Sequence, residues 1–273
     1  MRIIFLGTPD YLNPIIRVLN EHFELIAVGT TRSAPLETEK LNIPILKIDQ
    51  FSNETIEQFN NLKPDLLVVA SFGKIIPQEI LEIPRLGAIN IHPSKLPLYR
   101  GPSPVQSQLL NGTTDSAISF ILMDNKMDHG PLLYQEPFEI NPADTFQSLL
   151  TSMFKKSADI LPILIQSLID NKLTPIDQNH PQATFCKEIE KEDGYFDIEN
   201  PPSLEILHRM IRAFYPWPGT WTKWNGKIVK FLPNMQPGTS NLKPYLLQME
   251  GKSPTDLKSF LNGYPSFPLK NNL

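Results

Sequence analysis

The 273-residue chain has almost no cysteine and no long apolar run, and both shortages narrow the kinds of protein it can be. Its single cysteine, Cys186, excludes a disulfide framework and any metal site built from several cysteines. No apolar stretch approaches the roughly 20 residues of a membrane-spanning helix. The apolar opening, Met1–Leu6, is too short for the core of a signal peptide. We therefore expect a reduced, cytoplasmic protein that needs no metal and no membrane.

Motifs of several common enzyme classes are also absent. The first loop, residues 7–10, lacks the G-x-G-x-x-G of dinucleotide-binding proteins, and the chain has no P-loop. It contains neither the H-E-x-x-H of zinc metalloproteases nor the G-x-S-x-G of serine hydrolases. The sequence therefore gives no sign of a catalytic metal or of a side-chain nucleophile of these classes.

Apolar runs and helical segments alternate through the first part of the chain. Strands of a buried sheet are predicted at Arg2–Gly7, Glu24–Thr30, Pro44–Ile48, Leu66–Ala70 and Ala88–Ile91. Because helical segments separate them, the pattern favours an α/β fold with a Rossmann-like, mostly parallel sheet. Two further strands, at Ser116–Met123 and Leu132–Ile140, are expected to be antiparallel, and Thr31–Asn42 is predicted to be a polar loop.

The end of the chain differs in charge and composition from the rest. Residues 203–273 hold nine Lys and Arg against three acidic residues, which gives a net charge of +6. Because the whole chain has a net charge of −4, residues 1–202 have a net charge of −10. Such asymmetry indicates a polyanionic partner, although an uneven solvated surface explains it equally well. This part holds all three tryptophans, which we expect to be core residues, and Asn225-Gly226 predicts a β-hairpin. We predict a catalytic domain at 1–180, a linker at 181–202 and a small β-rich module at 203–273.

One stretch places two polar side chains at the end of a strand. Gly87–Gly101 reads G-A-I-N-I-H-P-S-K-L-P-L-Y-R-G, in which Asn90 and His92 lie on the same face because strand residues alternate. Pro93 ends the strand, since it has no N–H to donate. Ligands of open α/β sheets bind at the carboxyl ends of strands. The pair is therefore a candidate site, unless it is only the polar outer face of an edge strand.

These residue types suit transfer of an acyl group to an amine. His92 can exchange a proton near neutral pH, and the amide of Asn90 can donate a hydrogen bond to a developing oxyanion. The turn after the next strand supplies Asp124 and Asp128, and a carboxylate beside an imidazole stabilises its charged form. Because no side-chain nucleophile accompanies them, the amine of the substrate itself is expected to attack a bound carbonyl.

Five segments of the chain resemble motifs of the folate-dependent formyltransferases: Ile4–Asp10, Val68–Pro77, Gly87–Gly101, Met123–Tyr134 and Ile211–Trp221. The resemblance implies a Rossmann-like formyltransferase domain followed by an OB-like module, which is shortened here. It also implies transfer of a formyl group from 10-formyltetrahydrofolate to a primary amine. The last segment is similar to members that formylate the α-amine of initiator methionyl-tRNA.

Other acceptors occur in the same family. An amino-sugar on a nucleotide carrier is the main alternative, since Thr31–Asn42 carries no net positive charge to bind RNA. Glycinamide ribonucleotide, or water in a formyltetrahydrofolate hydrolase, are further possibilities. A relative that binds folate or RNA without catalysis is an alternative of another class.

The resemblance also assigns roles to single residues. Asn90, His92 and Asp128 match the catalytic trio of the family. The residues that the resemblance associates with folate are Phe72, Gly73, Ile75, Ile76, Ser94, Lys95, Leu96 and Pro97. Those predicted to bind the acceptor are Thr8, Pro9, Asp10, Arg100 and Gly101. The expected partners are a folate and initiator methionyl-tRNA.

Overall fold

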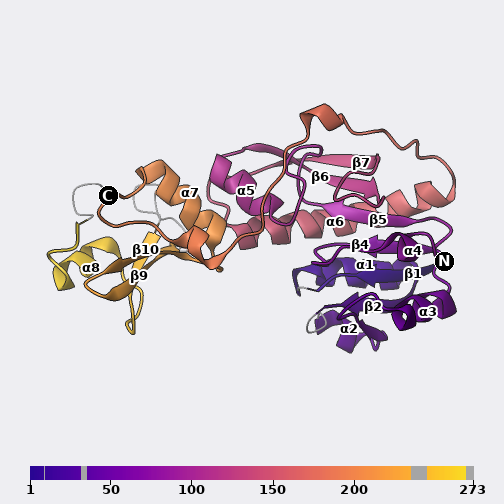
Figure 1. Cartoon of the computed structure of the whole chain (residues 1–273), viewed down its shortest axis with the longest axis horizontal. Coiled ribbons are helices and arrows are strands. Elements are labelled where there is room, and N and C mark those ends of the chain that lie inside the picture. The colour runs from indigo at the N-terminus through magenta and orange to yellow at the C-terminus, as the bar shows by residue number, and fades with distance from the viewer. Residues whose placement is uncertain (9, 32–35, 235–244, 269–273) are drawn as a thin grey trace. The chain divides into compact units, whose positions relative to one another are not determined.

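The computed structural model describes residues 1–8, 10–31, 36–234 and 245–268, and two β-sheets organise them. One sheet has seven strands in the order β3-β2-β1-β4-β5-β6-β7, and the other has three in the order β10-β9-β8 (Figure 1). The strands are β1 Arg2–Leu6, β2 Glu24–Thr30, β3 Ile45–Lys47, β4 Leu66–Val69, β5 Ala88–His92, β6 Asp115–Leu122, β7 Leu132–Glu139, β8 Thr220–Trp224, β9 Lys227–Pro233 and β10 Tyr245–Met249.

Helices separate most of these strands. The α-helices are α1 Asn13–His22, α2 Leu36–Lys40, α3 Asn53–Leu62, α4 Gln78–Leu81, α5 Pro104–Asn111, α6 Phe146–Ile169, α7 Leu204–Phe214 and α8 Leu257–Gly263. Three short 3-10 helices complete the set: η1 Asp10–Leu12, η2 His180–Gln182 and η3 Lys191–Gly194. Among these helices, none combines the length and the apolar character needed to cross a membrane.

The seven-stranded sheet is mostly parallel, as predicted. Strands β3, β2, β1, β4 and β5 run parallel to one another, whereas β6 is antiparallel to β5 and β7 is antiparallel to β6. All four side chains of β4 are buried, which agrees with its uninterrupted apolar sequence. From β1 the chain proceeds to β2 and β3 on one side and later to β4 and β5 on the other. Open α/β sheets bind ligands beside such a reversal of strand order.

The structure differs from the prediction at Thr31–Asn42, where α2 forms. Its Glu37 is mostly buried and accepts hydrogen bonds from Nε and Nη2 of Arg17, at 3.2 and 3.1 Å. A helix of five residues is too short to show the apolar periodicity by which helices are predicted.

The chain divides into two compact units. Unit 1 comprises Met1–Pro104, Asp115–Glu139 and Leu150–Cys186, and unit 2 comprises Val105–Thr114, Ile140–Leu149 and Lys187–Leu273. The two short internal segments of unit 2 belong to the range 1–180 predicted for the catalytic domain. The proposed boundaries at 180 and 202 stay a prediction.

Unit 2 contains the predicted hairpin and its own apolar core. Strands β8 and β9 pair antiparallel around Asn225 and Gly226, whose φ angles of 48° and 74° suit a tight hairpin turn. The core includes Leu207 and Ile211 of α7 together with Phe231 of β9. Of the tryptophans, Trp224 packs against this core, but Trp217 is 55% exposed. The expectation that all three are core residues is therefore wrong for Trp217.

Tyr245, at the start of β10, makes the stability of unit 2 sensitive to alkaline pH. Its side chain lies in the core, and burial raises the pKa of the phenol to about 12. The unfolded chain loses this proton near pH 10, so the folded state retains a proton that the unfolded state has released. Folding stability is therefore unaffected by this group below pH 10, and it falls by about 2–3 kcal/mol as the pH rises to 12.

We expect Tyr245→Phe to remove that part of the alkaline loss. Urea unfolding of both proteins at about pH 9 and about pH 11 measures it. Tyr195→Phe, at an exposed tyrosine of the same unit, is the control. An equal alkaline loss in Tyr245→Phe and the unmodified protein would contradict the argument.

Candidate active site

Strand β5 places Asn90 and His92 inside the sheet and not at its edge. It pairs with β4 on one side and with β6 on the other, where Asn90 faces Ile121 and His92 faces Ser119. His92 is only 4% exposed. The alternative that the pair decorates the outer face of an edge strand is therefore wrong.

The turn between β6 and β7 brings Asp128 to this pair. Oδ1 of Asp128 accepts a hydrogen bond from Nδ2 of Asn90 at 3.0 Å and lies 3.5 Å from Nδ1 of His92. Oδ2 accepts the backbone N–H of Gly101 at 2.8 Å. One carboxylate oxygen is therefore anchored to the backbone, and the other faces the amide and the imidazole. The fold thus joins three side chains that the sequence separates by up to 38 residues.

The hydrogen bonds of His92 define how its ring is used. Nε2 lies 2.9 Å from the backbone carbonyl oxygen of Tyr99, and a carbonyl oxygen only accepts, so Nε2 carries a hydrogen. Nδ1 is the nitrogen that faces Asp128. A proton on Nδ1 would therefore lie between the imidazole and a carboxylate, where His92 could exchange it with a reacting group.

The other acidic residue of the turn, Asp124, has a different partner. Its Oδ2 lies 2.6 Å from Nδ1 of His129. The ring of His129 stacks on that of His180 with a centroid distance of 4.0 Å and an angle of 4° between the planes. Of the two aspartates, Asp128 therefore belongs to the His92 site and Asp124 supports the neighbouring histidine pair.

Gln178, which belongs to no recognisable sequence motif, holds the backbone of the Asp128 turn. Its Nε2 donates to the carbonyl oxygens of Asp128, at 2.9 Å, and Gly130, at 2.7 Å. These bonds fix a turn in which Asp128 has a φ of 49°, a conformation that side-chain-bearing residues rarely adopt. Gln178 is therefore a positioning residue for the carboxylate.

Arg100 in turn fixes Gln178. The arginine is 3% exposed, and its Nε and Nη2 donate to Oε1 of Gln178 at 3.2 and 2.7 Å. Nη2 also lies 2.9 Å from Nδ1 of His180, and because a guanidinium only donates, Nδ1 of His180 is the acceptor. Desolvation, together with the charges of His129 and Arg100, lowers the pKa of His180, which agrees with an unprotonated Nδ1.

The loop after β4 has a buried side and an exposed side. Phe72 and Ile76 are buried, whereas Ile75 is 77% exposed. Gly73 has a φ of 78°. The exposed side chain of Ile75, beside the turn at Gly73, provides an apolar surface that suits the flat ring of a folate. The assignment of Phe72, Gly73, Ile75 and Ile76 to folate binding stays a prediction.

The second group predicted to bind folate lies directly after β5. Ser94 is fully buried and its Oγ donates to the carbonyl oxygen of Leu98 at 2.7 Å. Leu96 is also buried, and Pro97 follows it through a cis peptide bond. Nζ of Lys95 reaches outward to Asp115 at 2.6 Å. The side chains of Ser94 and Leu96 therefore shape the segment internally, and a ligand would meet its backbone.

The residues predicted to bind the acceptor are dispersed. Thr8 bonds Thr31 through the two hydroxyl oxygens at 3.2 Å, and Asp10 begins η1. Pro9 lies outside the described residues. Gly101 contacts Asp128 as described, and the buried guanidinium of Arg100 is engaged by Gln178 and His180. The roles of these residues toward an acceptor stay predictions.

Gly130 allows the Asp128 turn to lie close to β6. A Cβ atom at this position would lie 1.8 Å from the carbonyl oxygen of Leu122. We therefore expect Gly130→Ala to push the turn away from β6 and to lower the free energy of unfolding by about 1–3 kcal/mol. Thermal unfolding measures this loss. Gly263→Ala is the matched control, because a Cβ there meets no atom within 4 Å, and equal stability of the two variants would contradict the prediction.

Family models match most of the chain. The model described as "Formyl transferase" matches residues 1–165, and the one described as "Formyl transferase, C-terminal domain" matches residues 188–244. The first match includes all three residues of the Asn90 site, and the second includes α7 and the β8–β9 hairpin.

Curated relatives carry a more specific name. A methionyl-tRNA formyltransferase of Roseiflexus castenholzii is 36% identical over 248 residues, which cover 85% of this chain and 79% of the relative. One of Wolbachia is 31% identical over an alignment that covers 99% of each chain. Among solved structures, an N-formyltransferase from Helicobacter canadensis in complex with folinic acid and dTDP-3-aminofucose superimposes with a TM-score of 0.64. It is 19% identical and the match covers 91% of this chain and 95% of that one, so it supports the fold alone.

Proposed function

Because this chain belongs to the formyl transferase family and is a folate-dependent formyltransferase, we propose that its acceptor is the α-amine of initiator methionyl-tRNA. The observation that carries the proposal is the extent of the match to relatives of that name. Identities of 31–36% extend over 85–99% of the chain, and the Wolbachia relative matches from end to end. The proposal places the protein in the cytoplasm, with the charged initiator tRNA as its partner.

The formyl donor, 10-formyltetrahydrofolate, supplies the one-carbon group that is transferred. The exposed Ile75 beside buried Phe72 and Ile76 offers an apolar wall for the ring system of this donor. The polar site at the end of β5 offers hydrogen-bond donors for the formyl oxygen. The residues present therefore fit both the ring system and the formyl group of such a molecule.

The site supplies donors and one proton acceptor. Asn90 uses one amide hydrogen on Asp128 and retains a second, which we assign to the oxyanion that forms when the amine attacks the formyl carbon. A hydrogen on Nδ1 of His92 would provide a second donor there, shared with Asp128, whose Oδ1 lies 3.5 Å from Nδ1. Asp128 receives the excess proton of the attacking amine, either directly or through water. The tetrahedral intermediate then collapses as the bond between the formyl carbon and N10 of the folate breaks, and the proton passes to N10, which leaves the formylated amine and tetrahydrofolate. Because an aminoacyl α-amine has a pKa of about 7.7–8.0, much of it is neutral near pH 7 and no stronger base is needed.

A formyl-transfer assay tests the acceptor. The full chain is incubated with 10-formyltetrahydrofolate and, in separate reactions, methionyl-tRNA, a dTDP-linked amino-sugar, or no acceptor. We expect rapid N-formylation of methionyl-tRNA only. Faster formylation of the amino-sugar would overturn the tRNA proposal, and formate release without an acceptor would indicate a hydrolase. Absence of turnover with all three would favour a relative that binds without catalysis.

One observation favours the amino-sugar as the second candidate. Within Thr31–Asn42 the positive charges of Arg32 and Lys40 are balanced by Glu37 and Glu39. Lys40 lies 3.8 Å from Glu37, and Glu37 also binds Arg17. This segment thus offers no excess of positive charge to RNA, and a tRNA would have to be held by other parts of the chain.

A further inference from the structure

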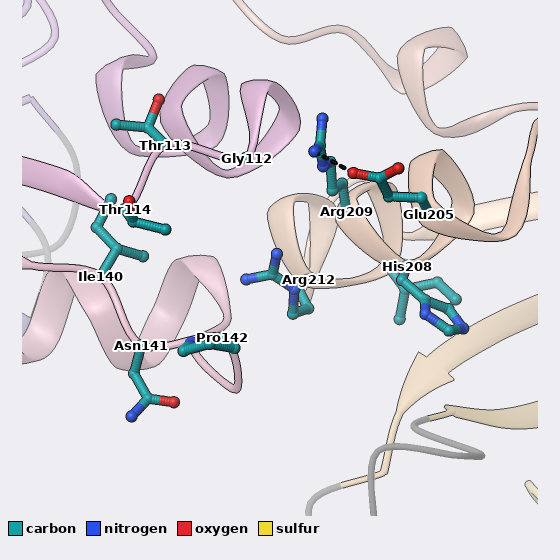
Figure 2. A pocket seen from close by; sticks show the side chains of 11 residues that line it. Gly112, Thr113, Thr114, Ile140, Asn141, Pro142, Glu205, His208, Arg209 and Arg212 are labelled. Carbon is teal, nitrogen blue, oxygen red and sulfur yellow. Dashed lines mark hydrogen bonds and ion pairs between the residues drawn. The ribbon is translucent and has the colours of Figure 1, made fainter.

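Unit 2 contains a cavity of about 330 Å³ that is separate from the residues assigned above. One wall is a face of α7, and the other walls are the turn at residues 112–114 and the segment at residues 140–142 (Figure 2). The α7 residues that line it include Glu205, Arg209 and Arg212, which recur at helical spacing on one side of the helix. The cavity is thus built from charged side chains on one wall and from backbone turns on the others.

Arg212 brings a half-buried positive charge to the cavity, and its surroundings neutralise that charge only in part. Its Nη1 donates to the backbone carbonyl oxygen of Asp144 at 3.0 Å, and it makes no ion pair within the part of the chain that the structure describes. The carboxylate of Asp144 is already engaged, because its two oxygens accept from the N–H of Asn141 and from Oγ of Ser148, each at 2.9 Å. Burial lowers the pKa of Arg212 and the negative charge of Asp144 raises it, with burial the larger effect, so the charge of Arg212 is compensated only in part.

Arg209 lies on the same face and is held in place from two sides. Its Nη2 forms an ion pair with Glu205, which Figure 2 draws as a dashed line. The guanidinium also covers Gly112, where a Cβ atom would lie 2.5 Å from its Cζ. The charge of Arg209 further lowers the pKa of Arg212, so the two guanidinium groups repel each other. An anion between them would relieve this repulsion.

We propose that this cavity is a phosphate-binding site in which Arg209 and Arg212 hold the phosphate oxygens. Guanidinium groups present several N–H donors in a fixed plane that matches the oxygens of a phosphate. Two guanidinium groups face one lining carboxylate, that of Glu205, so the wall has an excess of positive charge. Its most direct source of phosphate is the backbone of a nucleic-acid acceptor, and this part of the proposal rests on the proposed function. A soluble phosphorylated ligand would use the same chemistry.

Titration of the full chain with inorganic phosphate tests the site without any formyl transfer. We expect Arg212→Gln and Arg209→Gln each to weaken phosphate binding about tenfold, since each removes charged hydrogen bonds. Glu205→Gln should tighten binding severalfold, because it removes the competing carboxylate. Lys223→Gln, at an exposed lysine of β8, loses the same charge as the arginine variants and should bind phosphate normally.

Equal phosphate affinity in Arg212→Gln and Lys223→Gln would overturn the proposal, as would weaker binding by Glu205→Gln. The glutamate variant keeps the test decisive even where an arginine variant fails to fold, because Glu205 is 74% exposed. A short RNA hairpin distinguishes the source. If phosphate competes with the hairpin and Arg212→Gln weakens both ligands, the site binds nucleic-acid backbone. If Arg212→Gln weakens phosphate alone, the site serves a soluble ligand, whatever acceptor the enzyme formylates.

Discussion

Replacing Asn90 or His92 by alanine should lower formyl transfer by at least about 100-fold, because each removes a donor to the oxyanion. A single donor of this kind contributes roughly 2.7–4 kcal/mol to the stability of the transition state. The geometry supports such an effect, since Asp128 Oδ1 lies 3.0 Å from the amide nitrogen and 3.5 Å from the imidazole nitrogen. Both donors are therefore held by one anchored carboxylate before any substrate arrives.

The effect should appear in kcat at saturating folate and acceptor. Asn60→Ala on α3 and His22→Ala on α1 are matched controls, because both residues are exposed and lie outside the site. Thermal unfolding shows whether each variant still folds. Near-normal turnover by folded Asn90→Ala or His92→Ala would remove the basis for assigning the reaction to this pair.

Gln178→Ala should lower both catalysis and stability, although this residue is not expected to touch a substrate. The substitution leaves a buried arginine without its main acceptor and two carbonyl oxygens without their donor. We expect a loss of about 2–3 kcal/mol in the free energy of unfolding. Because the Asp128 turn is then free to shift, we also expect kcat to fall tenfold or more, in keeping with the sensitivity of catalysis to small displacements.

Gln178→Glu separates positioning from general stability. The glutamate keeps an acceptor for Arg100 but has no N–H for the carbonyl oxygens of Asp128 and Gly130. Its stability should therefore recover part of the loss, whereas its kcat should stay low and its KM values should change little. Gln166→Ala, at an exposed glutamine of α6, is the control. If kcat recovered together with stability in Gln178→Glu, the residue would be only a structural support.

Local patterns in the sequence were enough to predict most of the framework. The apolar run of β4 specifies its element because a strand that is buried on both faces has an uninterrupted apolar sequence. The Asn-Gly pair likewise specifies the β8–β9 hairpin. Helix α2 was not predicted, because its five residues make little more than one helical turn and cannot show a repeating apolar pattern. Strand β10 and helix α8 were not predicted either.

The candidate site could be predicted only in part from local patterns. Asn90 and His92 are indicated by their alternation with apolar residues before a proline, and the family resemblance adds Asp128. Gln178 gives no local signal, because its bonding partners lie 48 to 78 residues away and its neighbours are polar. Its role arises only when the chain has folded. The exposure of Trp217 is a similar case, since its neighbours in sequence do not determine which aromatic ring faces solvent.

The hydrogen bonds from Gln178 to the Asp128 turn determine when, during its synthesis, this enzyme can become active. The ribosome completes Asn90, His92 and Asp128 well before it adds residue 178. A nascent chain can therefore hold every reacting side chain before Gln178 fixes the backbone of the Asp128 turn. Residues 184–186 then add further ties, as the N–H of Arg100 donates to Thr184 and that of Cys186 donates back to Arg100. A fragment ending at residue 165, where the first family match stops, would lack all of these ties, whereas one extending through Cys186 would keep them.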